Sequence, residues 1–293
     1  MVADVVFVGV TTGSSLVHRA MPAWQPLLAS PCGLRGVDIS LGADDGTYVR
    51  LLGDLLRDES VAGAVVTTHK ARMFRAGREL FARLDPVALA CEEVNAVRRT
   101  GGGLHGWARD PVSAGRVADR IWPDAEGQVI CLGAGGTAVA LARHLLTTRP
   151  RLRFACADQD PAAVGHLARL AARPVAGYVG TGHWDDLVST APPGSLIVNA
   201  TGMGKDRPGS PITSRARFPP RSVIWELNYR GDLKFLSQAR LQARGRQLQV
   251  HDGWQLFCHG WAAALTPILG LPDDDALGDQ FAEAAQSLRP GAG

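Results

Sequence analysis

Three glycines stand where backbone atoms can hold a phosphate. Gly133, Gly135 and Gly136 follow the apolar run 128–132 and lead into a stretch with helical spacing of apolar residues. In this order, the first glycine permits a tight turn and the second lets the backbone approach a pyrophosphate, while the first N–H groups of the helix hold the anion. Asp158 follows Gly133 by 25 residues, close to the separation expected for a ribose-binding acid. The pattern predicts a dinucleotide site rather than an ordinary strand–helix turn.

The acid also bears on which dinucleotide binds. A carboxylate accepts hydrogen bonds from the hydroxyls of an adenosine ribose and repels the 2′-phosphate of NADP. Gln159 and Asp160 follow Asp158, and no arginine stands beside it. We therefore expect NAD as the cofactor in preference to NADP. The alternative is that Asp158 caps the next helix, a position that favours aspartate.

Alternating strands and helices must position these residues. Apolar runs predict buried strands, and apolar residues spaced by three and four predict helices. In the first part of the chain, we expect strands over 5–10, 36–41 and 61–68 and helices over 19–28 and 48–57. In the second part, we expect strands over 128–132, 152–157, 195–201 and 222–227 and a helix over 139–146. This alternation indicates parallel α/β architecture with both faces of each sheet covered.

Length and composition fit a folded protein of two domains. The 293 residues are 46% hydrophobic and 20% charged, which is ordinary for globular chains. We place the domain boundary between Ser113 and Ala125, where no low-complexity linker occurs, and expect the last residues, 288–293, to be frayed.

Charge and cysteine usage exclude several classes of function. Lys and Arg number 31 against 28 Asp and Glu, and no basic stripe is interleaved with aromatics, so we expect no nucleic-acid partner. The five cysteines form no CxxC pair, so we expect structural roles for them and no metal site. The N-terminus lacks a basic region before its short apolar run, and no run of 18 apolar residues occurs. We therefore expect a cytoplasmic protein without a membrane segment.

Several short segments together resemble the shikimate/quinate dehydrogenase family along nearly the whole chain. Each segment is brief, but they occur in the family's order and at its spacing. They are residues 9–15, VVTTHK at 65–70, EVNA at 93–96, GWARD at 106–110, LGAGGTA at 132–138, VNATGM at 198–203, ELNY at 226–229 and residues 252–265.

The resemblance implies a fold and an activity. The fold is an N-terminal α/β substrate domain (1–114), a Rossmann-type dinucleotide-binding domain (115–249) and a C-terminal helical segment (250–293) that packs back on the first domain. The activity is the reversible, nicotinamide-dependent oxidation of a ring hydroxyl in a hydroxylated cyclic acid. Such a reaction needs a group that removes a proton in one direction and donates it in the other.

Lys70 matches the catalytic lysine of the family and Asp110 matches its aspartate partner. Burial would move the pKa of a lysine towards neutrality, whereas an adjacent carboxylate orients the lysine and opposes that change. From the residues alone, the alternative is a solvated lysine after a strand and an aspartate that starts a turn before Pro111.

The resemblance also assigns substrate and cofactor contacts. Asn95 and Ser15 fall on substrate-binding positions of the family. Further expected substrate contacts are Ser14, Thr68, Tyr229 and His259. The expected cofactor contacts are Gly133, Ala134, Gly135, Gly136, Thr137, Ala138, Asp158, Asn199, Thr201 and Gly253. For Ser14, Thr67, Thr68, His69 and His259, an ordinary role as a loop or strand-end polar group remains an equal alternative.

Some polar positions of the family are apolar here. The second carboxylate-binding serine aligns with Val17, a polar residue before the lysine aligns with Val66, and a substrate-binding glutamine aligns with Gly260. Loss of such hydrogen-bonding groups weakens discrimination by several kcal/mol, about tenfold per 1.4 kcal/mol. We therefore expect a substrate other than shikimate.

Two functions follow from these observations. The leading one is an NAD-preferring dehydrogenase of a small cyclic polyol or hydroxy acid. The alternative is a noncatalytic sensor that binds a nucleotide and a ligand, although binding alone does not require a proton-transfer pair. The Trp-rich stretch 254–261 is compatible with core or with the interface of a homodimer.

Overall fold

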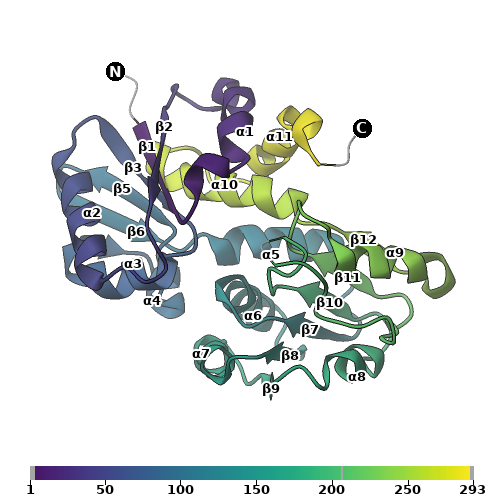
Figure 1. Ribbon diagram of the computed structural model, residues 1–293. Helices are drawn as coiled ribbons and strands as arrows, with labels where there is room; N and C mark the ends of the chain where they lie inside the picture. Colours follow the sequence, from purple (N-terminus) through teal and green to yellow (C-terminus); the bar gives the residue numbers. More distant parts are fainter. Residues whose placement is uncertain (1–3, 206, 291–293) are drawn as a thin grey trace. The chain divides into compact units, whose positions relative to one another are not determined.

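The computed structural model describes residues 4–205 and 207–290 (Figure 1). The chain divides into two compact units. The first unit contains the residues up to Asp110 together with those from Cys258 onward, and the second contains Pro111–Phe257. Each unit is built on one six-stranded sheet.

The sheet of the first unit is mixed. Its strand order is β2-β1-β3-β5-β6-β4, with β5 antiparallel to both β3 and β6 and the other pairs parallel. The strands are β1 Asp4–Gly9, β2 Leu34–Asp38, β3 Val61–Val66, β4 Phe81–Leu84, β5 Ala96–Thr100 and β6 Gly103–Trp107. The helices of this unit are α1 Val17–Trp24, α2 Asp45–Arg57, α3 Lys70–Gly77, α4 Pro86–Cys91 and α11 Ala276–Ala284.

Both faces of this sheet are covered. Alternate residues of a strand point to opposite sides of a sheet, and in β1 the residues on both sides pack against other elements. Val6 and Val8 of β1 pack in one core cluster with residues of α2, α3 and α4. Phe7, which points the other way, lies 5.0 Å from Trp261 of α10 (Trp254–Leu269), measured between ring centroids. A strand buried on both faces reads as a continuous apolar run, which is why β1 and β3 are visible in the sequence.

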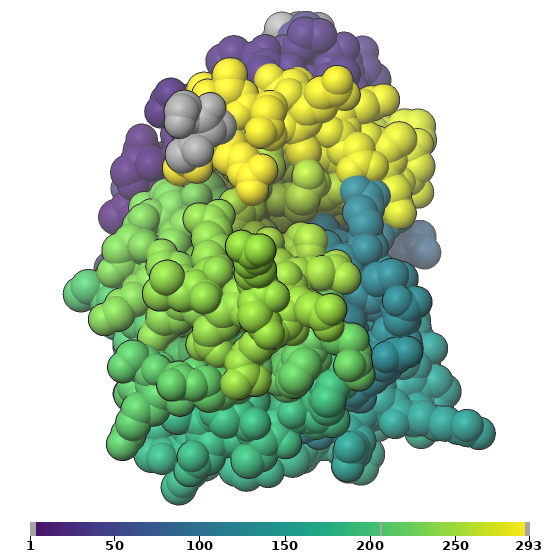
Figure 2. Space-filling model, turned by 90° about the vertical axis from the view of Figure 1, so that its right-hand side faces the viewer, coloured from purple at the N-terminus to yellow at the C-terminus, as the bar shows by residue number. Residues whose placement is uncertain are grey.

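The C-terminal segment packs on the first unit, as expected. The Trp24 indole N–H donates to the Phe281 carbonyl at 2.9 Å, and the two rings stack with centroids 4.4 Å apart. In Figure 2 the C-terminal residues (yellow) lie directly beside N-terminal residues (purple) on the surface of this unit. Trp254 and Trp261 are buried in the chain itself, so these two side chains belong to the core.

The sheet of the second unit is wholly parallel, with the order β12-β11-β10-β7-β8-β9. Its strands are β7 Gln128–Leu132, β8 Arg153–Asp158, β9 Ala176–Val179, β10 Leu196–Asn199, β11 Val223–Glu226 and β12 Gln249–His251. The associated helices are α5 Asp110–Ile121, α6 Gly136–Thr148, α7 Pro161–Leu170, α8 Trp184–Ser189 and α9 Lys234–Arg246.

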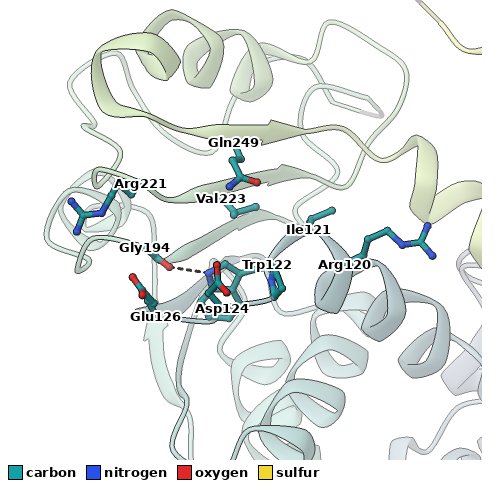
Figure 3. A pocket seen from close by; sticks show the side chains of 10 residues that line it. Arg120, Ile121, Trp122, Asp124, Glu126, Gly194, Arg221, Val223 and Gln249 are labelled. Carbon is teal, nitrogen blue, oxygen red and sulfur yellow. Dashed lines mark hydrogen bonds between the residues drawn. The ribbon is translucent and has the colours of Figure 1, made fainter.

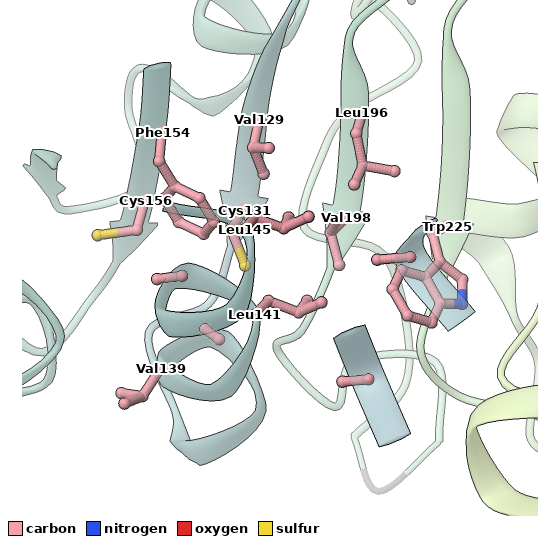
Figure 4. Packing of buried hydrophobic residues seen from close by; sticks show 14 of the residues in the cluster. Val129, Cys131, Val139, Leu141, Leu145, Phe154, Cys156, Leu196, Val198 and Trp225 are labelled. Carbon is pink, nitrogen blue, oxygen red and sulfur yellow. The ribbon is translucent and has the colours of Figure 1, made fainter. Parts of the chain in front are cut away.

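Two separate cores cover the faces of this sheet. Val129 and Cys131 of β7 pack with residues of α5, α6 and α7 on one face (Figure 4), whereas Ile130 and Leu132 pack with residues of α8 and α9 on the other. The order of strands and the helices on both faces confirm the expected Rossmann-type arrangement.

The structure differs from the sequence-based expectation at several places. The region 113–125, taken as a boundary, includes most of α5 (Asp110–Ile121). The helix expected over 19–28 begins at Val17 and ends at Trp24, followed by a 3-10 turn at Gln25–Leu27. The hairpin of β5 and β6 was not expected, and it makes the first sheet mixed rather than parallel. Of the expected frayed end (288–293), Leu288 belongs to the 3-10 turn Gln286–Leu288, and 291–293 lie outside the described residues.

Among the described residues, no helix has the length and apolarity needed to cross a membrane. All five cysteines are buried and unpaired with one another.

Candidate active site

Lys70 is the first residue of α3, and the turn that delivers it is anchored in the core. His69 precedes it and is buried. Its Nε2 lies 2.9 Å from the Ile39 carbonyl and its Nδ1 lies 2.9 Å from the Tyr48 hydroxyl. Since a carbonyl only accepts, Nε2 carries the proton and Nδ1 accepts from Tyr48. Both ring nitrogens are therefore used within the fold, and His69 positions the turn before Lys70.

The Lys70 ammonium is paired with two carboxylates. Its Nζ donates a hydrogen bond to Asp110 Oδ2 and lies 3.6 Å from Glu93 Oε2. The side chains of Lys70 and Asp110 are 14% and 22% exposed, so the pair is largely removed from water. Burial disfavours the charge on Lys70, but Asp110 and Glu93 outweigh it and hold the pKa of Lys70 above its ordinary value. The structure thus brings the two expected proton-transfer residues together.

Asn95 fixes the carboxylate of Asp110. The Asn95 amide nitrogen donates to Asp110 Oδ1 at 2.5 Å, and its carbonyl oxygen accepts from the Arg109 backbone N–H at 2.7 Å. Its own backbone joins the neighbouring strands, because its N–H donates to Trp107 and its carbonyl accepts from Val66. Asn95 was expected to bind substrate. In the structure its amide orients Asp110, the partner of Lys70, and a contact of Asn95 with substrate stays a prediction.

Glu93 is a site residue that the sequence analysis missed. It lies between α4 and β5, where Glu92 takes a left-handed conformation (φ 51°) and turns the chain. The Glu93 side chain is buried, and its Oε1 has no hydrogen-bond partner among the described residues. Burial raises the pKa of Glu93 to about 7, with Lys70 opposing and Asp110 adding to the shift. The one available signal was an acid directly before a buried strand.

The loop carrying the expected serines is held by Asp38. The backbone N–H and the hydroxyl of Thr12 both donate to Asp38 Oδ1, at 2.7 and 2.6 Å, and these bonds lower the pKa of Asp38. Ser14 is exposed and donates to the Thr11 carbonyl at 3.0 Å, while Ser15 is half-buried at the end of the 3-10 turn.

The other expected substrate contacts lie on three different segments of the chain. Thr68 is exposed in the turn before Lys70. His259 is buried, with its Nε2 3.3 Å from Asp279 Oδ1 of α11, and its contact with substrate stays a prediction. Tyr229 lies in the second unit, where its ring centroid is 6.1 Å from that of Trp254 and 4.6 Å from that of Phe257.

The positions that depart from the family pattern differ in their surroundings. Val17 and Val66 are fully packed in the first unit. A Cβ at Gly260 would meet no atom within 4 Å, so this face of α10 has open space where the family carries a glutamine.

The glycine turn of the second unit has the shape that a phosphate requires. Gly133 has φ +104°, and a Cβ there would lie 2.6 Å from the Ala200 backbone, so only glycine fits. Gly135 is exposed, and a Cβ there would meet nothing within 4 Å. Because α6 begins at Gly136, its first N–H groups lack intrahelical partners and can bind an anion. Thr137 is half-buried. The side chains of Ala134 and Ala138 are buried, so these two residues can contact a cofactor only through their backbone atoms.

Asp158 stands beside this turn. Its Oδ2 accepts from the Ala134 backbone N–H at 2.7 Å and its Oδ1 accepts from the Asp160 N–H at 3.1 Å. The cap of α7 is Asp160, whose side chain accepts from the Ala162 N–H at 2.8 Å. The alternative of Asp158 as the helix cap is therefore wrong. Each oxygen of Asp158 retains a further lone pair, so a diol can bind there.

Asn199 and Thr201 form a loop at the carboxyl end of β10. Asn199 Oδ1 accepts from the Thr201 N–H (3.1 Å) and hydroxyl (2.7 Å), and its amide donates to Glu226 Oε2 at 2.6 Å. Burial raises the pKa of Glu226 to about 7, against hydrogen bonds from Asn199 and Asn228. Both predicted residues thus shape this loop through their side chains.

Gly253 meets the end of β11 at close range. A Cβ there would lie 2.0 Å from the Leu227 carbonyl oxygen, so the packing of the backbone by itself requires glycine at this position.

A hollow of about 330 Å³ lies elsewhere on the second unit (Figure 3). Val223 and Gln249, which begin β11 and β12, line it together with Trp122, whose indole donates to the Gly194 carbonyl at 2.8 Å. Ligands of parallel α/β sheets bind at the carboxyl ends of the strands. The hollow is at the opposite ends and is not the nucleotide site.

Within the described ranges, no cluster of His, Cys, Asp and Glu side chains could hold a metal ion.

Comparison with known proteins decides the family. No protein-family model matches the chain. A shikimate dehydrogenase (NADP⁺) of Anaeromyxobacter dehalogenans strain 2CP-C is 30% identical to it over 94% of this chain and 96% of that protein. The chain belongs to the shikimate/quinate dehydrogenase family. As a member, it is a nicotinamide-dependent oxidoreductase that acts on a CH–OH group.

Solved structures of this family share the fold. A quinate dehydrogenase from Corynebacterium glutamicum in complex with NAD superposes with a TM-score of 0.75 at 21% identity, covering 98% of this chain and 99% of that one. The Thermus thermophilus shikimate dehydrogenase in complex with NADP(H) and shikimate has a TM-score of 0.69 at 23% identity, with coverage of 98% and 99%.

Proposed function

We propose that this dehydrogenase oxidises a ring hydroxyl of a small cyclic polyol or hydroxy acid other than shikimate and prefers NAD. The observation that carries the proposal is the buried Lys70–Asp110 pair, oriented by Asn95. A protein that only binds ligands has no use for a desolvated lysine whose partner is held in one orientation.

The pair performs the proton part of the reaction. In ketone reduction, the Lys70 ammonium donates a proton to the developing alkoxide; in alcohol oxidation, Lys70 receives the hydroxyl proton. Asp110 orients Lys70 through a charge-assisted hydrogen bond. Asn95 keeps the Asp110 carboxylate from rotating, so the ammonium has one preferred direction.

The second unit carries the residues that would hold the cofactor. The start of α6 and the open space over Gly135 fit a pyrophosphate, and Asp158 fits the hydroxyls of a ribose. A bound nicotinamide dinucleotide supplies the hydride acceptor. The Asp158 carboxylate would repel a 2′-phosphate, and no arginine stands beside it to bind one, which supports NAD over NADP.

The altered polar positions support a substrate other than shikimate. Val17 and Val66 offer no hydrogen bond where the family has polar groups, and Gly260 leaves space in place of an amide. A site that lacks these partners binds the family's hydroxylated acid less well and admits one with other substituents.

Turnover assays test the proposal. Purified protein is incubated with NAD or NADP and with shikimate, quinate and a panel of cyclitols, and nicotinamide reduction is followed by absorbance. We expect oxidation of a panel member with NAD at a higher kcat/KM than with NADP, and little with shikimate. Saturable binding of nucleotide and polyol without turnover would instead support the noncatalytic sensor. A homodimer and a cytoplasmic location stay predictions, and sedimentation velocity would decide the first.

A further inference from the structure

The Lys70–Asp110 pair leaves one step of alcohol oxidation unexplained. The charges around Lys70 hold its pKa above the ordinary value, so at neutral pH it is an ammonium. An ammonium donates a proton but cannot remove one from a hydroxyl. Oxidation therefore needs a second group that relieves Lys70 of its proton.

Two carboxyl groups adjoin Lys70, and their hydrogen bonding differs. Asp110 accepts from Lys70 through Oδ2 and from Asn95 through Oδ1, so each of its carboxylate oxygens has a donor. Glu93 has Oε2 at 3.6 Å from Lys70 Nζ, while its buried Oε1 has no partner in the described part of the chain. Glu93 is thus the carboxyl beside Lys70 with a buried oxygen that no described donor satisfies, and this oxygen can take up a proton.

We propose that Glu93 accepts the proton of the Lys70 ammonium, so that Lys70 meets the substrate hydroxyl as a neutral amine. The first step converts ammonium and carboxylate into amine and carboxylic acid. In the second step, the amine removes the hydroxyl proton. At the same time the carbinol carbon transfers a hydride, with both electrons of its C–H bond, to the oxidised nicotinamide, and a ketone is left. Lys70, which now holds the hydroxyl proton, is again an ammonium, and Glu93 keeps the proton that Lys70 gave up in the first step. This inference rests on the proposed dehydrogenase function and deepens it.

The backbone holds Glu93 beside Lys70. The N–H of Val94 donates to the Lys70 carbonyl at 3.2 Å, and the N–H of Glu93 donates to Ala88 at 3.3 Å, so the loop is fixed to both α3 and α4. Hydrogen bonds of catalytic groups are often long without substrate and shorten in the complex. Glu93 acts through Lys70 and need not touch the substrate.

Burial, together with two neighbouring charges, places the titration of Glu93 in the working range. The charged groups that act on its carboxyl are Lys70 of α3, which lowers its pKa, and Asp110 of α5, which raises it. Burial is the largest influence, and the pKa of Glu93 comes to about 7. Below pH 7, Glu93 is already protonated and cannot accept from Lys70. The kcat/KM of oxidation should then fall about tenfold per pH unit below a midpoint near 7.

The first test needs no substrate. We would follow the side-chain carboxyl ¹³C signals of glutamates and the ¹⁵N signal of Lys70 against pH in the cofactor-free protein, and assign Glu93 by its disappearance in Glu93→Gln. Assignment by difference also separates it from Glu226, whose pKa burial likewise raises to about 7. We expect the Glu93 carboxyl to titrate near pH 7, with Lys70 responding at the same midpoint. Titration of Glu93 below pH 5 would overturn the proposal.

The second test is the pH profile of oxidation. Glu93→Gln keeps the shape of the side chain but removes the acceptor, so its acidic limb should move to alkaline pH and kcat/KM at pH 7 should fall at least tenfold. Glu93→Asp should retain a limb near neutrality, and Glu92→Gln, the matched control next to it, should leave the limb in place. A uniform loss in Glu93→Gln with the limb still near pH 7 would contradict the proposal. If no polyol is oxidised, the proposed function fails, whereas the NMR titration still decides the role of Glu93.

Discussion

Asn95 and Asp110 are joined by a hydrogen bond of 2.5 Å from the Asn95 amide to Asp110 Oδ1, and the other carboxylate oxygen is left to Lys70. The three side chains come from the start of β5, the start of α5 and the start of α3. Three element ends thus converge within the first unit. Asn95 is held in turn by the Arg109 N–H, so the orientation of Asp110 is set by the backbone.

This arrangement predicts that Lys70 and Asp110 act as one unit in catalysis. Asp110→Asn should lower kcat, because the amide neither orients the ammonium nor compensates its charge. Once Lys70→Ala has removed the ammonium, adding Asp110→Asn should cost little more. The kcat values of wild type, both single variants and the double variant form the cycle. If the kcat losses of the two single variants multiply fully in the double variant, the two residues act independently and Asp110 does not belong to the proton-transfer pair.

The cofactor preference should depend on the charge of Asp158. In Asp158→Asn combined with Gln159→Arg, the asparagine oxygen still accepts from the Ala134 N–H, while the negative charge is replaced by a positive one nearby. We expect the ratio of kcat/KM for NADP to that for NAD to rise by at least about tenfold, equivalent to 1.4 kcal/mol. Asp160→Asn, which still caps α7, is the matched control and should not change the ratio. A wild type that already prefers NADP would show that Asp158 does not bind the ribose.

Gly260 should limit the use of shikimate. We expect wild-type kcat/KM for shikimate to lie below about 10⁴ M⁻¹s⁻¹, the lower end of ordinary enzymes. Gly260→Gln places an amide in open space on α10 and should raise this value about tenfold, the effect of one added hydrogen bond. Gly245→Gln, at an equally open position on α9, should have no effect. Efficient turnover of shikimate by the wild type would contradict the proposed substrate preference.

Glu226 should contribute to stability through its three donors. Its Oε2 accepts from Asn199, and its Oε1 accepts from the N–H and the side-chain amide of Asn228. In Glu226→Gln, an NH₂ group would face one of these donors in a buried place, so the free energy of unfolding should fall by about 1–3 kcal/mol. Urea unfolding at pH 8 measures this, and exposed Glu283→Gln is the control. A change within about 0.5 kcal/mol, as for surface substitutions, would mean that the network adds nothing.

The sequence predicts the second unit better than the first for a physical reason. Strands such as β7 are buried on both faces, so Val129–Leu132 is an uninterrupted apolar run, and Gly133 marks its end. The hairpin of β5 and β6 is short and carries Arg98 and Arg99, so its pattern is weak. Glu93 and Asn95 could be read as letters of a motif. Their contacts with Lys70 and Asp110 could not be predicted from the sequence, because these contacts depend on which ends of strands and helices meet in space.

The most direct test of the account is the effect of Lys70→Ala on turnover of a substrate identified in the panel. If Lys70 moves the proton, kcat should fall by about 10² to 10⁴-fold, the usual contribution of general acid–base catalysis. The Kd of NAD should stay within about twofold, because the residues expected to bind its pyrophosphate belong to the second unit. Lys234→Ala, which removes an exposed lysine at the start of α9, should match wild type in both measurements. Near-wild-type kcat in Lys70→Ala would show that this lysine does not perform the proton transfer.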